Sequence, residues 1–411
     1  MIRAKPGNRA DVMRERGAYL ARPAPPRLAP RPWTPARAGA GVGPGGAGRR
    51  VVIVSGDIGG GHDAAADELA ARLAARGVPV DRLNFLSMLS RPVHALVRES
   101  YRTMLRWAPW SYQALFAATG ESASSVRLIR GVLRPAWSRV RRRLPSDTGV
   151  VVTTFPFANQ LFGPLRRRGG LAAPVVTYVT DFVAHPIWRC PGVDVYCVVH
   201  ERVLGRDPAA GAGDVRVVRP LISDRFGVGP GISQVKARQR FGLPEHGRLA
   251  LVAAGAWGVG DVRRTAADVL ATGRALPVVL CGRNESLYRR MLGFPGHVLG
   301  WVDDMPTLMR AVDVVVENAG GLTCLESIAS GLPTVTYRPL PGHGRASAAV
   351  LRGTGLTAYV DSVKHLGPAL TLLLDGGGTA AKLAAGAEMA DVVSEAVSRL
   401  PGGPPGHGRP G

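Results

Sequence analysis

Three consecutive glycines followed by a histidine, Gly59-Gly60-Gly61-His62, are the first residues of this chain that could carry out chemistry. They come directly after the apolar run Val51–Val54 and before a helix-forming stretch that begins at Ala64. Glycines allow positive φ angles and a close approach of the backbone to a ligand, and a helix N-terminus favours negative charge. A histidine at that position can take a proton from an attacking hydroxyl group. The alternative interpretation is a histidine that caps a tight turn.

A second group of polar and glycine residues follows the apolar run Val314–Val316. It has the sequence Glu317-Asn318-Ala319-Gly320-Gly321-Leu322-Thr323-Cys324-Leu325-Glu326. The loop enters a predicted helix whose N-terminal amides could hold a diphosphate. Thr323 could cap that helix or bind a phosphate oxygen, and Glu326 could accept hydrogen bonds from a ribose diol or stabilise the helix dipole. The loop lacks the G-x-x-x-x-G-K-[ST] and G-x-G-x-x-G patterns, which argues against a P-loop nucleotidase and an NAD enzyme.

Both groups need strands and helices to position them, and the sequence predicts two α/β domains. Short β-branched runs alternate with glycine loops and helix-forming stretches, as in a buried parallel sheet. The expected strands cover residues 51–54, 150–152, 175–179, 195–199, 215–218, 249–254, 276–281, 298–301, 312–316 and 334–337. A second glycine loop, 255–260, follows the first strand of the second series. Two such domains place a ligand in the cleft between them.

Composition marks the expected domain boundaries. Residues 1–49 are rich in Arg, Pro and Gly and are expected to form a disordered basic tail. An N-terminal domain over 50–222, a linker over 223–246, a C-terminal domain over 247–400 and a flexible tail over 401–411 follow. No apolar stretch is long enough for a transmembrane helix, and no secretory signal is predicted. The four cysteines lack C-x-x-C spacing, so we expect no metal site, no disulfide framework and a cytoplasmic setting.

The chain of 411 residues carries a formal net charge of +22, and only four of its 52 basic residues are lysine. The codon bias of G+C-rich DNA is one source of so many arginines. An aromatic segment, Tyr101–Phe116, precedes arginines that run from Arg127 to Arg143 without an acidic residue. Apolar aromatic surface beside positive charge suits an anionic membrane, whereas helices packed on the sheet with arginines outward are the alternative. The aromatic residues do not interleave with the basic runs, so nucleic acid is not an expected partner.

Several motifs occur in the order found in one enzyme group. They are Gly59-Gly60-Gly61-His62 with Ala64-Ala65, Cys281-Gly282-Arg283-Asn284, Gly300-Trp301-Val302-Asp303-Asp304-Met305, Asn318-Ala319-Gly320-Gly321-Leu322-Thr323 and Pro341-Gly342. Over about residues 50–375 the chain resembles the monogalactosyldiacylglycerol synthase and processive diacylglycerol glucosyltransferase group of glycosyltransferase family 28. Thr180-Asp181 and His185-Pro186 with Trp188 also resemble that group's stretch near the acceptor.

The resemblance implies a GT-B architecture, in which two Rossmann-like domains face each other across a cleft. His62 would be the general base, with Asp57 or Asp181 orienting it or competing for its role. Gly59, Gly60, Gly61 and His185 would lie at the acceptor and phosphate loop. The implied donor-binding residues are Gly255, Val302, Asn318, Gly320, Gly321, Leu322, Thr323, Glu326 and His343.

The activity implied is that of an inverting hexosyltransferase that uses a nucleotide sugar, usually UDP-linked, without a cofactor or an essential metal. A lipid hydroxyl such as that of diacylglycerol would be the acceptor, and the protein would lie peripherally at the inner face of the plasma membrane. Relatives often have Pro-Gly-Gln-Glu where this chain has Pro341-Gly342-His343-Gly344, which leaves the donor hexose open. The alternatives are a natural-product glycosyltransferase, a UDP-sugar epimerase of GT-B fold and a basic nucleic-acid-binding protein.

Overall fold

The computed structural model describes residues 49–56, 60–89, 94, 99, 123–183, 185–204, 213–227, 231–376 and 386–398. All of them belong to one compact unit, Gly46–Gly411. Some predictions lie outside these residues: the basic tail over 1–48, the aromatic segment Tyr101–Phe116, the positions of Asp57 and Gly59, and the tail over 401–411.

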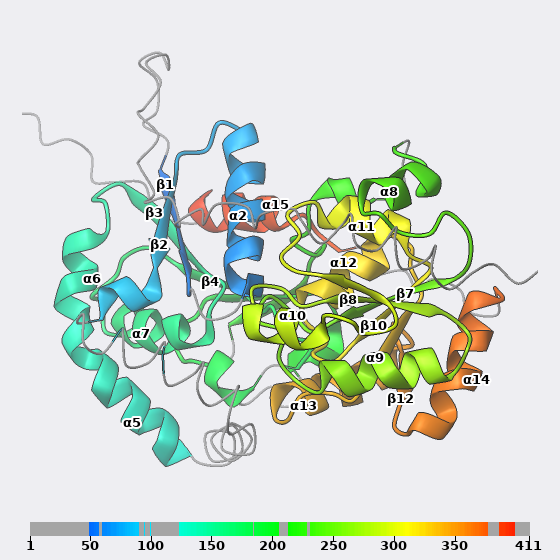
Figure 1. The fold of residues 1–411 in the computed structure, drawn as a ribbon. Helices are drawn as coiled ribbons and strands as arrows, with labels where there is room; N and C mark the ends of the chain where they lie inside the picture. The colour runs from blue at the N-terminus through cyan, green and yellow to red at the C-terminus, as the bar shows by residue number, and fades with distance from the viewer. Residues whose placement is uncertain are drawn as a thin grey trace, which may run out of the picture. The chain divides into compact units, whose positions relative to one another are not determined.

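The first half of the chain builds a six-stranded parallel sheet with the strand order β2-β1-β3-β4-β5-β6 (Figure 1). Its strands are β1 (Arg50–Ser55), β2 (Val80–Asn84), β3 (Thr148–Thr153), β4 (Val175–Tyr178), β5 (Val195–Val198) and β6 (Asp214–Val217). The valines of β1 and β3 are fully buried. A strand that is covered on both faces carries a continuous apolar run instead of an alternating one, as these two do.

The second half builds another six-stranded parallel sheet, with the order β12-β11-β10-β7-β8-β9. Its strands are β7 (Leu249–Ala253), β8 (Leu276–Leu280), β9 (His297–Leu299), β10 (Val314–Glu317), β11 (Thr334–Tyr337) and β12 (Ala358–Val360). β7 and β10 are the central pair, and Val252 lies opposite Val316 in their ladder. Both strands are buried along their whole length.

Helices follow most of the strands. In the first half they are α2 (Gly60–Ala75), α5 (Ala123–Leu133), α6 (Trp137–Arg143) and α7 (Pro156–Arg167), with the 3₁₀ turns η1 (Phe85–Met88), η2 (Arg134–Ala136), η3 (Pro186–Trp188) and η4 (Glu201–Leu204). Then follow η5 (Asp224–Phe226), α8 (Gln234–Arg240), α9 (Val262–Ala271), α10 (Glu285–Met291), α11 (Met305–Ala311), α12 (Leu322–Ala329), α13 (His343–Thr354), α14 (Val363–Leu374) and α15 (Met389–Ser398). Leu69 and Leu73, four residues apart, are the fully buried leucines of α2.

Each sheet has one point where the strand order reverses. In the first sheet β2 lies on one side of β1 and β3 on the other. In the second sheet β8 lies on one side of β7 and β10 on the other. Ligands of open α/β sheets bind at such switch points, beyond the carboxyl ends of the strands. The loops after β1, β3, β7 and β10 are therefore the expected walls of the site.

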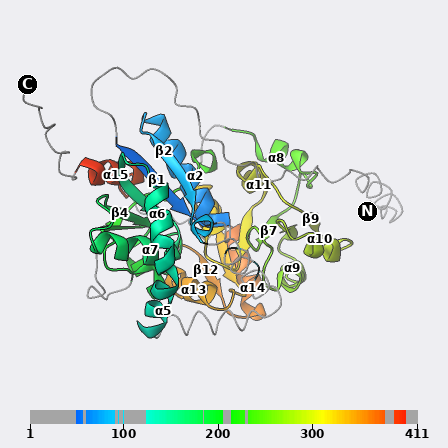
Figure 2. The same ribbon diagram turned by 90° about the vertical axis from the view of Figure 1, so that its left-hand side faces the viewer.

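The last helix, α15, packs against α2 and β3 of the first sheet, and Figures 1 and 2 both place it beside β1 and α2. The predicted boundary at residue 400 assigned it to the C-terminal domain instead. Its apolar residues Met389 and Val393 lie one turn apart and join the core of the first sheet. An ion pair of 2.6 Å between Arg76 and Asp391 adds a polar contact to the same junction.

The predicted linker over 223–246 contains η5 and α8, and α8 packs against α11 of the second half. The buried Arg238 side chain holds this contact, because its Nε donates to the Ala311 oxygen at 2.9 Å and its Nη2 lies 2.8 Å from the Asp313 carboxylate. A buried charge needs such partners. This part of the segment is thus attached to the second sheet.

Candidate functional site

His62 lies in the first turn of α2, and its ring is held at one nitrogen. Its Nδ1 atom lies 2.6 Å from the main-chain oxygen of Thr154 and 3.0 Å from the hydroxyl oxygen of Thr180. Because a carbonyl oxygen only accepts hydrogen bonds, the neutral ring carries its proton on Nδ1 and a lone pair on Nε2. Phe155 meets the ring edge-on, with 5.1 Å between ring centres. The ring is therefore oriented so that Nε2 can accept a proton.

Asp181, which the resemblance implied as a partner or competitor of His62, forms its hydrogen bond with another residue. Its Oδ2 accepts a hydrogen bond of 2.8 Å from the Trp188 indole, while Thr154 and Thr180 hold the Nδ1 of His62. The fully buried Trp188 ring lies 6.1 Å from the imidazole, centre to centre. Asp181 thus fixes the tryptophan that stands beside the histidine. The two threonine contacts depend on how β3 and β4 lie beside α2, which spacing along the chain does not reveal.

His185 has a structural contact next to this wall. It precedes η3, and its Nδ1 accepts a hydrogen bond of 3.2 Å from the main-chain nitrogen of Ile187. The residue is 8% exposed. The predicted acceptor residue therefore caps the turn that carries Trp188.

Two buried amide side chains of α7 fix the same turn, and sequence analysis did not single them out. Asn159 Nδ2 donates to the Trp188 oxygen at 2.7 Å, and Gln160 Nε2 donates to the Ile187 oxygen at 2.6 Å. Arg130 of α5 donates in turn to Gln160 Oε1 at 2.7 Å. Polar residues on the apolar side of a helix next to a motif are the sequence signal that could have found them.

The glycine loop after β7 adopts positive φ angles that favour glycine. Gly255, Gly258 and Gly260 have φ values of 68°, 54° and 102°. A Cβ atom on Gly258 would lie 2.6 Å from the oxygen of Cys281, so no other residue fits there without movement. Asn284 Nδ2 donates to the Trp257 oxygen at 3.1 Å and holds the loop in place.

The loop after β10 leads into α12 and shows which amides remain for a ligand. The amides of Ala319 and Gly320 both donate to the carboxylate of Glu317, Ala319 at 2.8 Å. The first amides of a helix have no acceptor within it, and no side chain caps α12. Gly321, Leu322 and Thr323 therefore supply the amides of the described loop that could bind an anion.

Glu326 lies one turn into α12 and is largely buried. Burial raises the pKa of its carboxyl to about 7. The group therefore changes its charge near neutral pH, which the sequence did not predict.

Val302, the predicted uracil contact, is half-buried and follows an exposed tryptophan. The Arg283 guanidinium lies 4.0 Å from the centre of the Trp301 ring, and the indole donates to Asp303 at 2.7 Å. Trp301 is 46% exposed. Arg283 and Trp301 form a flat cation–π pair next to Val302.

The predicted sugar-facing loop ends where α13 begins, at His343, after Gly342 with a φ of 74°. A Cβ atom on Gly344 would lie 2.9 Å from the Leu340 Cβ and 3.1 Å from the Asn318 oxygen. Position 344 therefore has little room for a side chain in this backbone.

The loops of the two halves lie next to each other. A Cβ atom on Gly60 would be 3.4 Å from the Cβ of Ala256, and one on Gly61 would be 3.7 Å from the Cβ of Leu322. The structure thus brings the start of α2, with its histidine, to the glycine loop of β7 and to the first turn of α12. Of the predicted residues, Gly59 is outside the described part.

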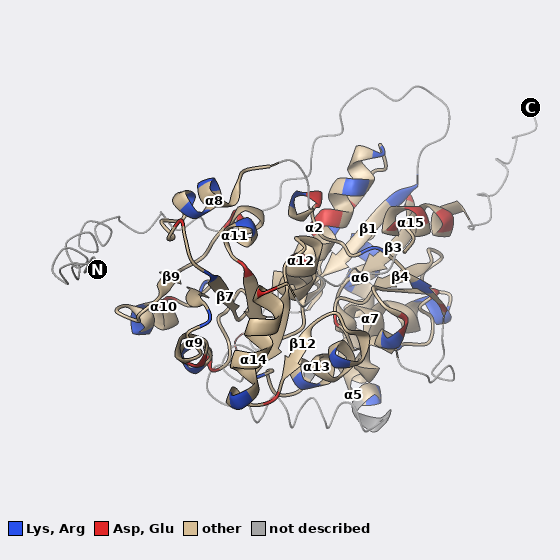
Figure 3. Cartoon of the chain, turned by 90° about the vertical axis from the view of Figure 1, so that its right-hand side faces the viewer, with Lys and Arg blue, Asp and Glu red and all other residues tan. Residues whose placement is uncertain are grey.

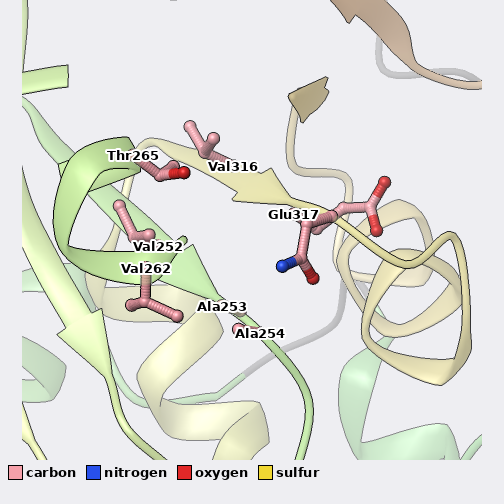
Figure 4. A pocket seen from close by; sticks show the side chains of 8 residues that line it. Val252, Ala253, Ala254, Val262, Thr265, Val316 and Glu317 are labelled. Carbon is pink, nitrogen blue, oxygen red and sulfur yellow. The ribbon is translucent and has the colours of Figure 1, made fainter. Parts of the chain in front are cut away.

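A small cavity of about 10 Å³ lies beneath these loops (Figure 4). Its lining residues are Val252, Ala253, Ala254, Val262, Thr265, Val316, Glu317 and Asn318. That volume holds about one water molecule, so it is too small for a nucleotide. A donor would lie above it, against the loops themselves.

Among the described residues, no three His, Cys, Asp or Glu side chains converge where they could hold a metal ion. No helix in this part of the chain is both long enough and apolar enough to span a membrane. The four cysteines, all described, are buried and unpaired.

Comparison with known sequences confirms the resemblance expected from the motifs. Residues 62–214 match the model of the monogalactosyldiacylglycerol (MGDG) synthase family. A processive diacylglycerol β-glucosyltransferase of Bacillus subtilis (strain 168) is 28% identical over 242 residues, which are 55% of this chain and 60% of the relative. The enzyme of the same name from Bacillus pumilus (strain SAFR-032) is 26% identical over 238 residues, with the same coverage. The matches thus span about three fifths of these relatives' length.

Comparison with solved structures confirms the GT-B fold. The glycotransferase of kitacinnamycin superposes with a TM-score of 0.51 at 17% identity, over 86% of this chain and 95% of that one. UGT89C1 of Arabidopsis thaliana, complexed with quercetin, gives a TM-score of 0.52 at 11% identity, over 85% and 99% of the two chains. At these identities the likeness concerns the fold alone.

Proposed function

We propose that this protein is an inverting hexosyltransferase that moves a hexose from a UDP sugar to a hydroxyl group of diacylglycerol. His62 carries the proposal, because its Nδ1 is held by the Thr154 oxygen and its Nε2 is left to act as a base. The family match and the names of the relatives support the acceptor class.

The transfer would follow from the positions of these groups. Nε2 of His62 takes the proton of the acceptor hydroxyl while the hydroxyl oxygen forms a bond to the anomeric carbon. The bond from that carbon to the diphosphate breaks on the opposite side, which inverts the centre and releases UDP. The amides of Gly321, Leu322 and Thr323, with the positive end of α12, stabilise the charge on the departing diphosphate.

The remaining predicted residues would hold the nucleoside. The Glu326 carboxylate accepts hydrogen bonds from the ribose hydroxyls, and the main chain at Val302 meets the uracil edge. Gly255 and its loop line the diphosphate from the side of β7. The backbone of α13 begins at His343, the residue that the resemblance assigns to the hexose.

We also propose that the protein works peripherally at the inner face of the plasma membrane, on anionic lipid. Leu128 and Val132 of α5 lie one turn apart and are 70% and 63% exposed. Arg134, Arg139 and Arg141 follow on the exposed side of η2 and α6, and residues 123–143 contain no acidic side chain (Figure 3). Apolar groups at the lipid surface and arginines at its phosphates would hold this helix there, at about 1 kcal/mol for each basic residue.

The direct test supplies UDP-glucose, UDP-galactose and other UDP-hexoses to the full chain with diacylglycerol in anionic vesicles. UDP release and the mass of the lipid product are measured, and a parallel reaction contains only water-soluble acceptors. The proposal expects UDP release and a hexosylated lipid with at least one donor. The proposal is refuted if none of the UDP-hexoses gives UDP release. Turnover confined to the soluble acceptors would refute the lipid assignment.

A further inference from the structure

Glu317, the last residue of β10, has a buried carboxyl group that the proposed reaction does not use. The residue is 3% exposed. Its Oε2 accepts the amides of Ala319 and Gly320, and its Oε1 accepts the hydroxyl of Thr336 on β11 at 2.5 Å. All the contacts of the carboxyl thus lie within the protein, and Figure 4 shows it turned away from Val252 and Val262 of the cavity.

These contacts determine the shape of the loop that leads into α12. Because the carboxyl binds the amides two and three residues after it, the chain turns back on the end of β10. Gly320 completes the turn with a φ of 62°, and a Cβ atom there would lie 2.9 Å from the Leu351 side chain and 3.0 Å from that of Ser347. The loop is therefore confined between the Glu317 carboxyl and α13.

Asn318, the residue after Glu317, connects this loop to two other loops of the site. Asn318 Nδ2 donates to the main-chain oxygen of Val259 at 2.9 Å, and the main-chain oxygen of Asn318 accepts the amide of Leu340 at 2.8 Å. A displacement of the loop after β10 would consequently move the glycine loop after β7 and the loop before α13. Asn318 thus links the three loops that the donor would touch.

We propose that Glu317 is a positioning residue for the donor, whose carboxyl sets the turn that leaves the Gly321, Leu322 and Thr323 amides directed at the diphosphate. The inference deepens the proposed function and rests on it for the identity of the ligand. Glu317 touches neither donor nor acceptor and acts through the two amides that it binds.

A neutral side chain of the same shape meets the same requirements. Burial raises the pKa of the Glu317 carboxyl, against the pull of the Thr336 hydroxyl and the two amides. Burial raises the pKa of the neighbouring Cys324 thiol, and the charge of Glu317 adds to that rise. Thr336 is linked further to the Thr357 hydroxyl at 3.0 Å. In Glu317→Gln the amide oxygen accepts the two main-chain N–H groups, and the NH₂ group donates to the Thr336 oxygen.

The experiment compares Glu317→Gln, Glu317→Ala and a control variant in the full chain. Thr334→Val is the control. It removes the buried hydrogen bond of 2.6 Å between the Thr334 hydroxyl and that of Ser327 on α12, with a longer one to the Leu332 oxygen, and leaves the contacts of Glu317 in place. KM for the UDP-hexose and kcat are measured in the vesicle assay. Hydrogen exchange of residues 317–323, measured by mass spectrometry without any ligand, reports on the loop itself.

We expect Glu317→Ala to raise the donor KM about tenfold, through loss of the turn, with a much smaller change in kcat. Its loop amides exchange faster, whereas Glu317→Gln and Thr334→Val keep donor KM and exchange close to wild type. Wild-type donor KM in Glu317→Ala overturns the proposal, as does an equal rise of KM in Thr334→Val or in Glu317→Gln. If the wild-type protein turns over no UDP sugar, the proposed function fails, and hydrogen exchange alone tests the role of Glu317 in the loop. Unchanged exchange in Glu317→Ala would overturn that role, and faster exchange would support it.

Discussion

With Glu326 at the ribose, as proposed, its raised pKa should make donor binding depend on pH near neutrality. Burial raises the pKa of this carboxyl from 4.5 to about 7. About a tenth of the group is therefore ionised at pH 6 and about nine tenths at pH 8. An ionised carboxylate accepts hydrogen bonds from both ribose hydroxyls. A donor that binds this form has an apparent dissociation constant that falls about tenfold between pH 6 and pH 8.

Calorimetric titration with a UDP-hexose, in the absence of acceptor, measures this dependence directly. A nucleotide sugar suits the assay because its diphosphate is esterified at both ends and does not titrate in that range, unlike the terminal phosphate of UDP. Glu326→Gln should bind the donor more weakly than wild type at pH 8 and with little change between pH 6 and pH 8. A wild-type affinity that stays constant over this range, or a pH dependence that survives in Glu326→Gln, would refute the assignment of Glu326 to the ribose.

The same burial lowers the stability of the folded protein above pH 4.5. Because the folded-state pKa of about 7 exceeds the ordinary value of 4.5, the unfolded chain loses this proton first as the pH rises. The free energy of unfolding is not lowered below the ordinary pKa. It falls as the pH rises to the folded-state pKa, and above that value the loss is complete, at about 3 kcal/mol. Denaturant unfolding should accordingly find Glu326→Gln more stable than wild type by up to about 3 kcal/mol at pH 8, and equal to it near pH 4. Equal stability at both pH values would show that the carboxyl is ionised in the fold without cost.

Other substitutions test the acceptor side. His62→Ala should lower kcat by about 10²- to 10⁴-fold, the usual share of a general base, while donor affinity in calorimetry stays the same; near-normal turnover excludes His62 as the base. Asp181→Asn keeps an oxygen for the Trp188 indole and should retain most of the activity that Asp181→Ala loses, and an inactive Asp181→Asn would restore a catalytic role to the carboxylate. The double change Leu128→Ser and Val132→Ser should weaken cosedimentation with anionic vesicles and leave the melting temperature unchanged, whereas unaltered cosedimentation would remove α5 from the membrane contact.

The sequence predicted the order of strands, glycine loops and helices well because each of these features is local. Gly60 and Gly61 open α2 directly after β1, and Gly320 and Gly321 precede α12 after β10, as the composition of both stretches indicated. The GT-B fold was implied by the resemblance of the ordered motifs to one enzyme group. Each motif follows the end of a strand, and the carboxyl ends of the strands meet at one edge of a parallel sheet.

The partners of the site residues could not be predicted from spacing. Thr154 holds His62 through its main-chain oxygen, and every residue has such an oxygen. In the sequence Glu317 is one of several polar residues of the loop, but in the structure its side chain reaches back to two amides and across to the next strand. Contacts of this kind depend on the packing of strands that lie far apart in the sequence. The same holds for α15, whose amphipathic pattern indicates a buried face without indicating which sheet covers it.

The return of α15 to the first sheet has a consequence for the order in which the protein is made. Residues 249–376, which hold every strand of the second sheet, are synthesised before Met389 and Val393. Until then the surface of β3 and α2 that α15 covers is open to water, so the half that is translated first is completed last. A nascent chain in that state exposes apolar surface to its neighbours, as does any fragment that stops at residue 222. The ten-residue helix α15 thus determines when the first half becomes a finished fold.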